Sequence, residues 1–191
     1  MSDTVSNGIT QALLAADAAL CGVPHMVIGG VAGLLHGTAR HTEDVDLTAL
    51  ADGVDLGALL ERCHAQGLEE RIPDALAFAT QSQVLLLVHR LTGVPVDVTL
   101  AWLPYEEQAL ARAQRIQVQQ VSLPVIAVQD LILYKFVAWR PRDQEDVRAL
   151  LIRHRAVLDH EGLRTQLAHM AALLECGERL VEFDAMWAAL C

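Results

Sequence analysis

The chain has 191 residues and a formal net charge of −10; 53% of its residues are apolar and 20% are charged. This length and apolar content suffice for the core of one ordinary domain, and they exclude an intrinsically disordered chain. The acidic balance disfavours a duplex DNA partner, because an acidic surface repels polyphosphate, but it permits a local basic strip and small or cationic substrates.

The apolar runs of the chain are short. The run VLLLV at residues 84–88 falls far below the ~20 residues that a membrane-spanning helix needs. Residues 1–8 lack the basic start and the apolar stretch of a secretory signal. We therefore expect a cytoplasmic protein with no membrane partner.

The cysteines are widely spaced and form no C-x-x-C pair. They are Cys21, Cys63, Cys176 and Cys191. In a chain of this size and expected compartment, this spacing favours free thiols over a disulfide framework or a structural zinc site.

The first third of the chain shows alternating helix and strand patterns. Residues 8–21 place apolar side chains at helical spacing, and the segment PHMVIGG at 24–30 is typical of a short buried strand that ends in a glycine turn. The segment VAGLLHG at 31–37 predicts about two turns of helix. The segment DVDLTAL at 44–50 alternates polar and apolar residues, which indicates a strand, and residues 54–66 are expected to be helical.

The middle of the chain predicts a β-hairpin and further strands. QVLLLVHR at 83–90 and VPVDVTLA at 94–101 flank a connection that contains glycine. Pro104 can begin a helix that ends near Ala113, because proline suits the first helical position. The segment RIQVQQVSLPVI at 115–126 predicts one or two short strands.

Beyond Ala127 the pattern is wholly helical. Helices are expected near residues 127–139, 143–154, 159–174 and 178–190. The chain is therefore expected to have an α/β (α+β) core of residues 1–124, followed by a helical C-terminal part of residues 125–191 that packs on it.

Three carboxylates stand out in the predicted strands. Asp44 and Asp46 are two residues apart, so on a strand they project to the same side. Asp97 is an acid within an otherwise apolar strand. If these strands pair, the three carboxylates converge, and such a cluster needs a cation. Oxygen ligands at a site open to substrate favour Mg²⁺ or Mn²⁺.

These features also have plainer interpretations. Asp44 and Asp46 can lie on a solvated strand face, and Asp97 can be a hydrogen-bonded polar residue near a strand end. Gly29 and Gly30 follow the first predicted strand, where glycine lets backbone N–H groups approach a phosphate or simply forms a tight turn.

The segment GGVAGLLHGTARHTEDVDL, residues 29–47, resembles the signature of the nucleotidyltransferase superfamily with the DNA polymerase β-like fold. Within it, the form R-x-T-x-D-x-D-L at residues 40–47 is similar to that of the minimal prokaryotic group that includes the AbiEii-type toxins. A second block, VIAVQDLILYKFVAWRPRDQEDVRALL at residues 125–151, is similar to the helical segment of this group, with Lys135 and an R-x-x-D-x-x-D element at residues 140–146.

The resemblance implies a fold and a reaction. The fold is a small mixed sheet flanked by helices, and the reaction moves a nucleoside monophosphate from a nucleoside triphosphate such as ATP to a hydroxyl acceptor. Asp44 and Asp46 would hold the metal ions, while Asp97 would complete the second ion's shell and act as base on the acceptor. Gly29 and Gly30 would approach the phosphates through their backbone. A serine that often follows the first strand in this superfamily is absent, so no hydroxyl contact is available there.

The resemblance leaves the roles of the basic residues open. Arg40 would either contact phosphate or fix the D-x-D strand by pairing with a carboxylate. Lys135 would either reach the triphosphate from a helix or be a surface lysine. Asp143 is expected to cap its helix, and Asp146 to pair with a nearby arginine.

Two classes of function follow. The first is an active enzyme whose acceptor is a tRNA, a protein or a small molecule such as an antibiotic, with a toxin–antitoxin role and an antitoxin partner implied by the resemblance. The alternative is a catalytically inactive nucleotide-binding or interaction module with the same fold.

Overall fold

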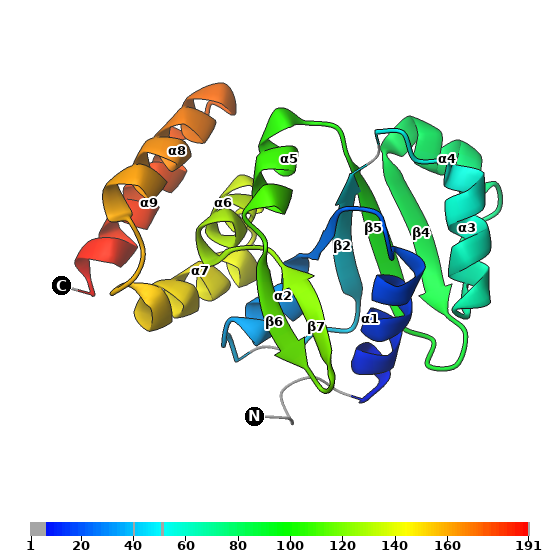
Figure 1. Ribbon diagram of the computed structural model, residues 1–191. Helices are drawn as coiled ribbons and strands as arrows, with labels where there is room; N and C mark the ends of the chain where they lie inside the picture. Colours follow the sequence, from blue (N-terminus) through cyan, green and yellow to red (C-terminus); the bar gives the residue numbers. More distant parts are fainter. Residues whose placement is uncertain (1–6, 40, 51, 191) are drawn as a thin grey trace. The chain divides into compact units, whose positions relative to one another are not determined.

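A computed structural model describes residues 7–39, 41–50 and 52–190 (Figure 1). The chain divides into two compact units. One unit comprises Met1–Leu35 and His41–Ala127, and we call it the sheet unit. The other comprises His36–Arg40 and Val128–Cys191, and we call it the helical unit.

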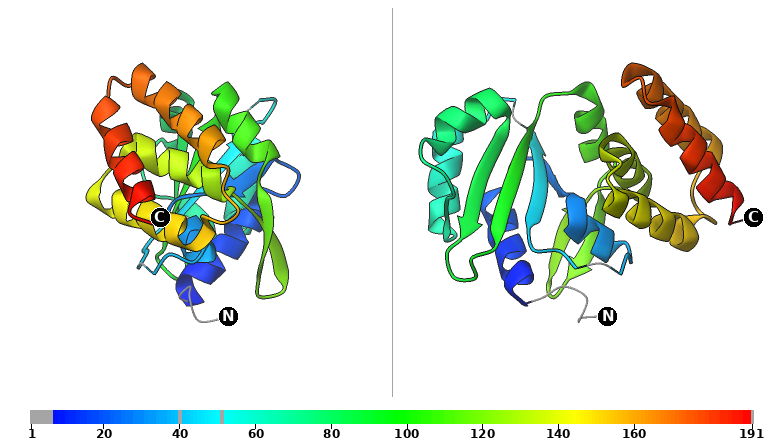
Figure 2. Two further views of the ribbon diagram at one scale, coloured as in Figure 1. Left: turned by 90° about the vertical axis from the view of Figure 1, so that its left-hand side faces the viewer. Right: turned by 180° about the vertical axis from the view of Figure 1, so that it is seen from behind.

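The sheet unit is built on a mixed sheet in which the described strands follow the order β3-β4-β5-β2-β1-β7-β6 (Figures 1 and 2). The strands are β1 His25–Val27, β2 Val45–Leu50, β3 Leu68–Glu70, β4 Val84–His89, β5 Pro95–Ala101, β6 Gln114–Val118 and β7 Val121–Val125. The β2–β5 and β1–β7 pairs are parallel, and the remaining pairs are antiparallel. The pair β2–β5 therefore joins two segments that lie far apart in the sequence.

Helices surround this sheet. The helices of the unit are α1 Asn7–Ala19, α2 Gly29–Leu35, α3 Leu56–Ala65, α4 Ala75–Ser82 and α5 Pro104–Ala111. Helix α1 packs against α3 and against strands β2, β3 and β5. Along β5, Val96, Val98 and Leu100 are buried, whereas Asp97 and Thr99 on the other face are half-buried. This alternation leaves polar side chains on the second face of the sheet, where a site can form.

The predicted α/β fold class is confirmed: a mixed sheet is flanked by helices, and the last part of the chain is helical. Two boundaries differ from the expected ones. Helix α2 begins at Gly29, so the two glycines open the helix instead of preceding it, and β2 begins at Val45, so Asp44 lies immediately before the strand.

Strand β3 and helix α4 were not predicted from the sequence. Helix α4 lies between Asp74 and Gln83, which both adopt left-handed backbone conformations with φ of 53° and 58°. Glycine usually takes such positions, so a helix bounded by aspartate and glutamine lacks the usual stop signal. Strand β3 has only three residues, two of them exposed glutamates, and so it shows no apolar alternation.

The helical unit consists of α6 Val128–Ala138, α7 Pro141–His154, α8 His160–Leu173 and α9 Gly177–Ala188. Helix α6 packs against α7 and α8, and α8 packs against α9. Phe136 and Phe183 are fully buried in this unit. The segment His36–Arg40 joins it through a hydrogen bond of 2.8 Å between the His154 ring and the carbonyl of His36. Throughout the described part of the chain, every helix is too short or too polar to span a lipid bilayer.

The described cysteines are free thiols in contrasting surroundings: Cys21 is exposed, and Cys63 and Cys176 are buried. Cys191 lies outside the described residues. Burial raises the pKa of the Cys63 thiol to about 11. Because the thiolate is the reactive form, Cys63 should resist alkylation.

We expect iodoacetamide at pH 8 to label Cys21 in the native protein and to leave Cys63 unlabelled, whereas both react in urea. Peptide mass spectrometry of the trapped protein measures the two sites separately. Labelling of Cys63 as fast as Cys21 in the native protein would contradict the burial of Cys63 in α3.

Candidate functional site

The strand register brings the predicted acids together. Asp46 on β2 and Asp97 on β5 are directly opposite each other in the parallel pair. Asp44 lies just before β2, and its charge is close enough to raise the pKa of Asp97. Three carboxylates from two distant segments therefore lie near one another in the sheet unit, an arrangement that the sequence predicts on the condition that these strands pair.

Opposing influences act on the pKa of Asp97. Its side chain is 32% exposed, and burial is the largest influence on its carboxyl group. Burial and the Asp44 charge raise the pKa of Asp97, and the Arg71 guanidinium lowers it, so that the net direction is upward from the ordinary value. The group is therefore a better proton acceptor than an ordinary aspartate.

Arg71 is the residue of this site that the sequence did not reveal. Its Nη2 atom lies 2.7 Å from Oδ1 of Asp97. Arg71 follows β3 directly, and its backbone N–H donates to the carbonyl of Leu86 on β4 at 3.0 Å. The extension of the β3–β4 pairing thus carries the guanidinium to the acids. Because β3 has no recognisable pattern, no sequence signal placed Arg71 near Asp97.

Asp46 is held close to the start of α2. The backbone N–H of Ile28 donates to the carbonyl of Asp46 at 2.9 Å. Gly29 has a φ of +64°, and a Cβ atom on it would collide with the carboxylate of Asp46. Glycine is required at this position for two reasons: the left-handed backbone and the close approach of the acid.

The other predicted residues have distinct surroundings. The Thr42 hydroxyl donates to Oδ1 of Asp44 at 2.9 Å, which orients that carboxylate. Gly30 is buried in the first turn of α2. Arg40 lies outside the described residues. The approach of Gly29 and Gly30 to a phosphate stays a prediction.

Lys135 lies in the helical unit and is buried, with only 4% of its surface exposed, so it is not a surface lysine. Its Nζ atom is 2.5 Å from Oδ2 of Asp146 and 3.8 Å from Oδ1 of Asp143. Asp143 also accepts the backbone N–H of Arg140, and so it caps α7 as expected. Asp146 pairs with this lysine, where the sequence suggested an arginine. A contact between Lys135 and a triphosphate stays a prediction.

The three carboxylates have the right chemistry to bind a divalent ion, but their arrangement in this structure is not yet that of a metal site. Their oxygens are the hard ligands that Mg²⁺ and Mn²⁺ prefer; Asp46 and Asp97 lie on strands, and Asp44 directly precedes β2. However, within the described ranges no group of three or more His, Cys, Asp or Glu side chains is arranged to hold a metal ion. One reason is visible: Oδ1 of Asp97 faces the Arg71 guanidinium.

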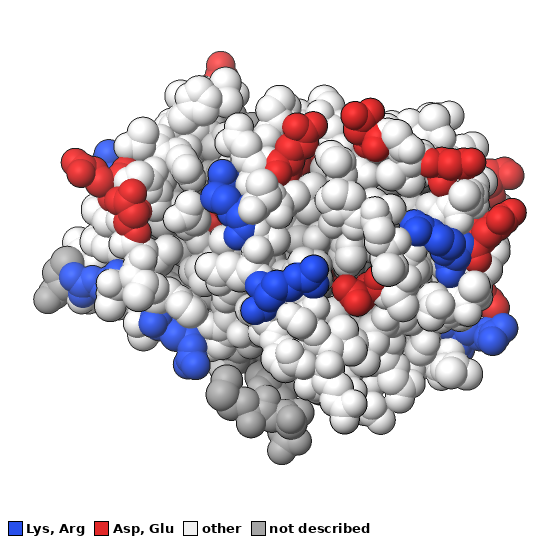
Figure 3. Space-filling model, viewed as in Figure 1, with Lys and Arg blue, Asp and Glu red and all other residues white. Residues whose placement is uncertain are grey.

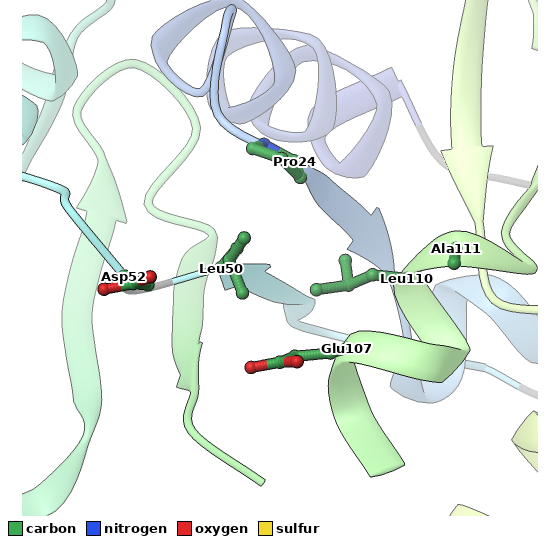
Figure 4. Close-up of a pocket in the computed structure, with 6 residues that line it drawn as sticks. All are labelled: Pro24, Leu50, Asp52, Glu107, Leu110 and Ala111. Carbon is green, nitrogen blue, oxygen red and sulfur yellow. The ribbon is translucent and has the colours of Figure 1, made fainter. Parts of the chain in front are cut away.

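The surface near the sheet gives two further facts. On the face drawn in Figure 3, acidic and basic side chains are interspersed and do not gather into one basic strip. A hollow at the far end of β2 is lined by Pro24, Leu50, Asp52, Glu107, Leu110 and Ala111 (Figure 4). It contains none of the three acids, and Leu50 ends β2 four residues after Asp46.

We expect Gly29→Ala to lower the free energy of unfolding by about 2–4 kcal/mol, because the new side chain adds a clash with Asp46 to the backbone strain. Gly22→Ala is the matched control, since Gly22 has a φ of +83° and its new Cβ would meet no atom within 4 Å. The control should lose only the ~1–2 kcal/mol of backbone strain. Urea denaturation followed by circular dichroism measures both variants, and equal losses would refute the close approach.

The buried lysine generates a second expectation. Lys135→Met removes the ammonium group that lies 2.5 Å from the buried Asp146 carboxylate, which should cost about 3–5 kcal/mol of stability. The double variant Lys135→Met with Asp146→Leu should recover much of this loss. In a Trp102→Phe background the remaining tryptophans, Trp139 and Trp187, both report on the helical unit, so urea unfolding by fluorescence measures its stability. A single variant as stable as the wild type would show that the ion pair is not needed.

Solved structures share this fold across nearly the whole chain. The solution structure of the antibiotic-resistance factor ANT(2'')-Ia is 19% identical, with 90% of this chain and 93% of that chain covered and a TM-score of 0.56. The crystal structure of ANT(2'')-Ia in complex with adenylyl-2''-tobramycin is 19% identical, with 87% and 96% covered and a TM-score of 0.55. JHP933 from Helicobacter pylori is 14% identical, with 97% and 93% covered and a TM-score of 0.54. At these identities the likeness shows the fold alone.

None of the curated proteins compared with the chain matches it. A family comparison reaches further, because residues 11–187 match the family described as nucleotidyltransferase of unknown function, DUF6036. The match spans both units and confirms the predicted nucleotidyltransferase class. The chain therefore belongs to the DUF6036 family of nucleotidyltransferases.

Proposed function

We propose that this protein is a metal-dependent enzyme that moves a nucleoside monophosphate from a nucleoside triphosphate to a hydroxyl group of an acceptor. The observation that carries the proposal is the parallel register that sets Asp46 opposite Asp97, with Asp44 close by. A purely structural strand pair has no need for three acids at one point, because their mutual repulsion costs stability.

The side chains divide the work. Divalent ions bound at this site would supply charge stabilisation for an in-line displacement. Asp44 and Asp46 would hold these ions, and the Thr42 hydroxyl keeps the Asp44 carboxylate oriented. Gly29 and Gly30 present the start of α2, where backbone N–H groups favour the triphosphate.

Asp97 completes the ligand set and takes the proton. Its carboxylate is the group proposed to accept the proton of the acceptor hydroxyl, since such a transfer needs a base within reach of that hydroxyl. The acceptor oxygen forms a bond to the α-phosphorus as the bond to pyrophosphate breaks. Pyrophosphate leaves, and the proton passes to Asp97.

The identity of the nucleotide donor and the identity of the acceptor are supported by different observations. An adenylylated product occupies the structure of ANT(2'')-Ia, so ATP is the first donor to test. For the acceptor, that complex and the net charge of −10 support a cationic small molecule, whereas the resemblance to AbiEii-type toxins supports a macromolecule and an antitoxin partner. Each acceptor class therefore enters the assay as its own arm.

The assay supplies Mg²⁺ and each α-labelled nucleoside triphosphate, with tobramycin, purified tRNA or cell extract as acceptor. We expect label to pass to one acceptor class, and we expect Asp46→Asn to reduce transfer to background while the protein stays folded, since a metal ligand is lost. Asp52→Asn is the charge-matched control, because Asp52 is exposed in the turn after β2.

Three results decide the outcome. Full activity of Asp46→Asn would overturn the metal assignment. Tight nucleotide binding without transfer to any acceptor would favour the alternative, a binding module that has the fold and lacks turnover. Growth inhibition by the wild type, relieved by the product of an adjacent gene, would establish the toxin role.

A further inference from the structure

The contact between Arg71 and Asp97 is close but poorly directed. The Nη2 atom lies 2.7 Å from Oδ1, an atom buried from solvent, yet no described residue gives Oδ1 a well-aligned hydrogen bond. The guanidinium thus compensates the charge of Asp97 without fully satisfying the oxygen. A cation that binds the carboxylate oxygen more strongly can therefore replace the guanidinium.

Arg71 is also placed where it can move. It follows β3, a strand of three residues at the edge of the sheet, and its side chain is 32% exposed. A long side chain that starts from a sheet edge can leave Asp97 without disturbing the buried face, where Val96 and Val98 pack. The acid itself is fixed in the middle of the parallel pair β2–β5.

In this structure the Arg71 guanidinium is therefore the cation beside Asp97. A divalent ion carries twice the charge of a guanidinium and binds carboxylate oxygens at about 2.0–2.6 Å, so it attracts the three acids more strongly than Arg71 does. The absence of a ready three-ligand arrangement among the described residues agrees with an Asp97 that is turned toward the guanidinium.

We propose that Arg71 is a built-in counter-cation that competes with the divalent ion for Oδ1 of Asp97, and so sets the metal concentration at which the site assembles. The proposal rests on the proposed function, because it takes the acids to be metal ligands. Arg71 acts through Asp97 and is a positioning residue. Without metal it relieves the repulsion among Asp44, Asp46 and Asp97, and with metal it swings away.

The test is a titration of the nucleotide-free protein with Mn²⁺, followed by electron paramagnetic resonance. We expect Arg71→Gln to bind Mn²⁺ about three- to tenfold more tightly than the wild type, because the competing ion pair is gone. Arg90→Gln is the matched control: it removes the same charge from an exposed arginine that pairs with Glu69 at 3.6 Å. Its affinity should stay within about twofold of the wild type.

A double-variant cycle assigns the effect to Asp97. In an Asp97→Asn background the change Arg71→Gln should no longer tighten binding, because the contested oxygen is lost. Arg71→Lys retains the positive charge and should bind Mn²⁺ more weakly than Arg71→Gln. If circular dichroism shows that Arg71→Gln unfolds, Arg71→Met is the second variant, because it also removes the charge, and it should bind Mn²⁺ more tightly than the wild type.

The results separate this proposal from the function. Tighter Mn²⁺ binding by Arg71→Gln in a protein that transfers no nucleotide would support the exchange and refute the enzyme. Equal or weaker binding by Arg71→Gln than by Arg90→Gln would overturn the exchange, as would a gain that persists in the Asp97→Asn background. Failure of both the wild type and Arg71→Gln to bind Mn²⁺ would also overturn it.

Discussion

The parallel pairing of β2 with β5 is the constraint on which the site depends. It sets Asp46 opposite Asp97 and leaves Asp44 within electrostatic reach. Backbone hydrogen bonds along the two strands hold the acids together against their repulsion, because a slip of one residue would turn the side chains to the opposite face. The fold therefore supplies the free energy that a cluster of like charges needs.

The surroundings of the acids offset this repulsion locally. Gly29 removes the side chain that would otherwise push the Asp46 carboxylate away, and the Arg71 guanidinium stands beside Asp97. These two features differ in whether they can change. The glycine is a fixed steric requirement of the backbone, whereas the arginine is a long side chain from a sheet edge and can exchange for another cation.

The helical unit uses opposite charges in a different way. Lys135 and Asp146 are both buried, and the lysine also lies near Asp143. Buried ions of this kind are costly unless they are paired, so removing one partner is far more harmful than breaking a surface pair. The same residues that resemble a family motif in the sequence thus have a complete structural role within their own unit.

The sequence by itself determined the class of the fold, the order of most elements and the three acids, because strand periodicity and the D-x-D spacing depend on local geometry alone. It also predicted that Asp44, Asp46 and Asp97 would meet only if their strands paired. The tertiary structure decided that pairing and its register, the position of Arg71, and the burial of Lys135. These depend on contacts between distant segments. Arg71 lies in the connection between β3 and α4, and neither element shows a local pattern that could have indicated its place.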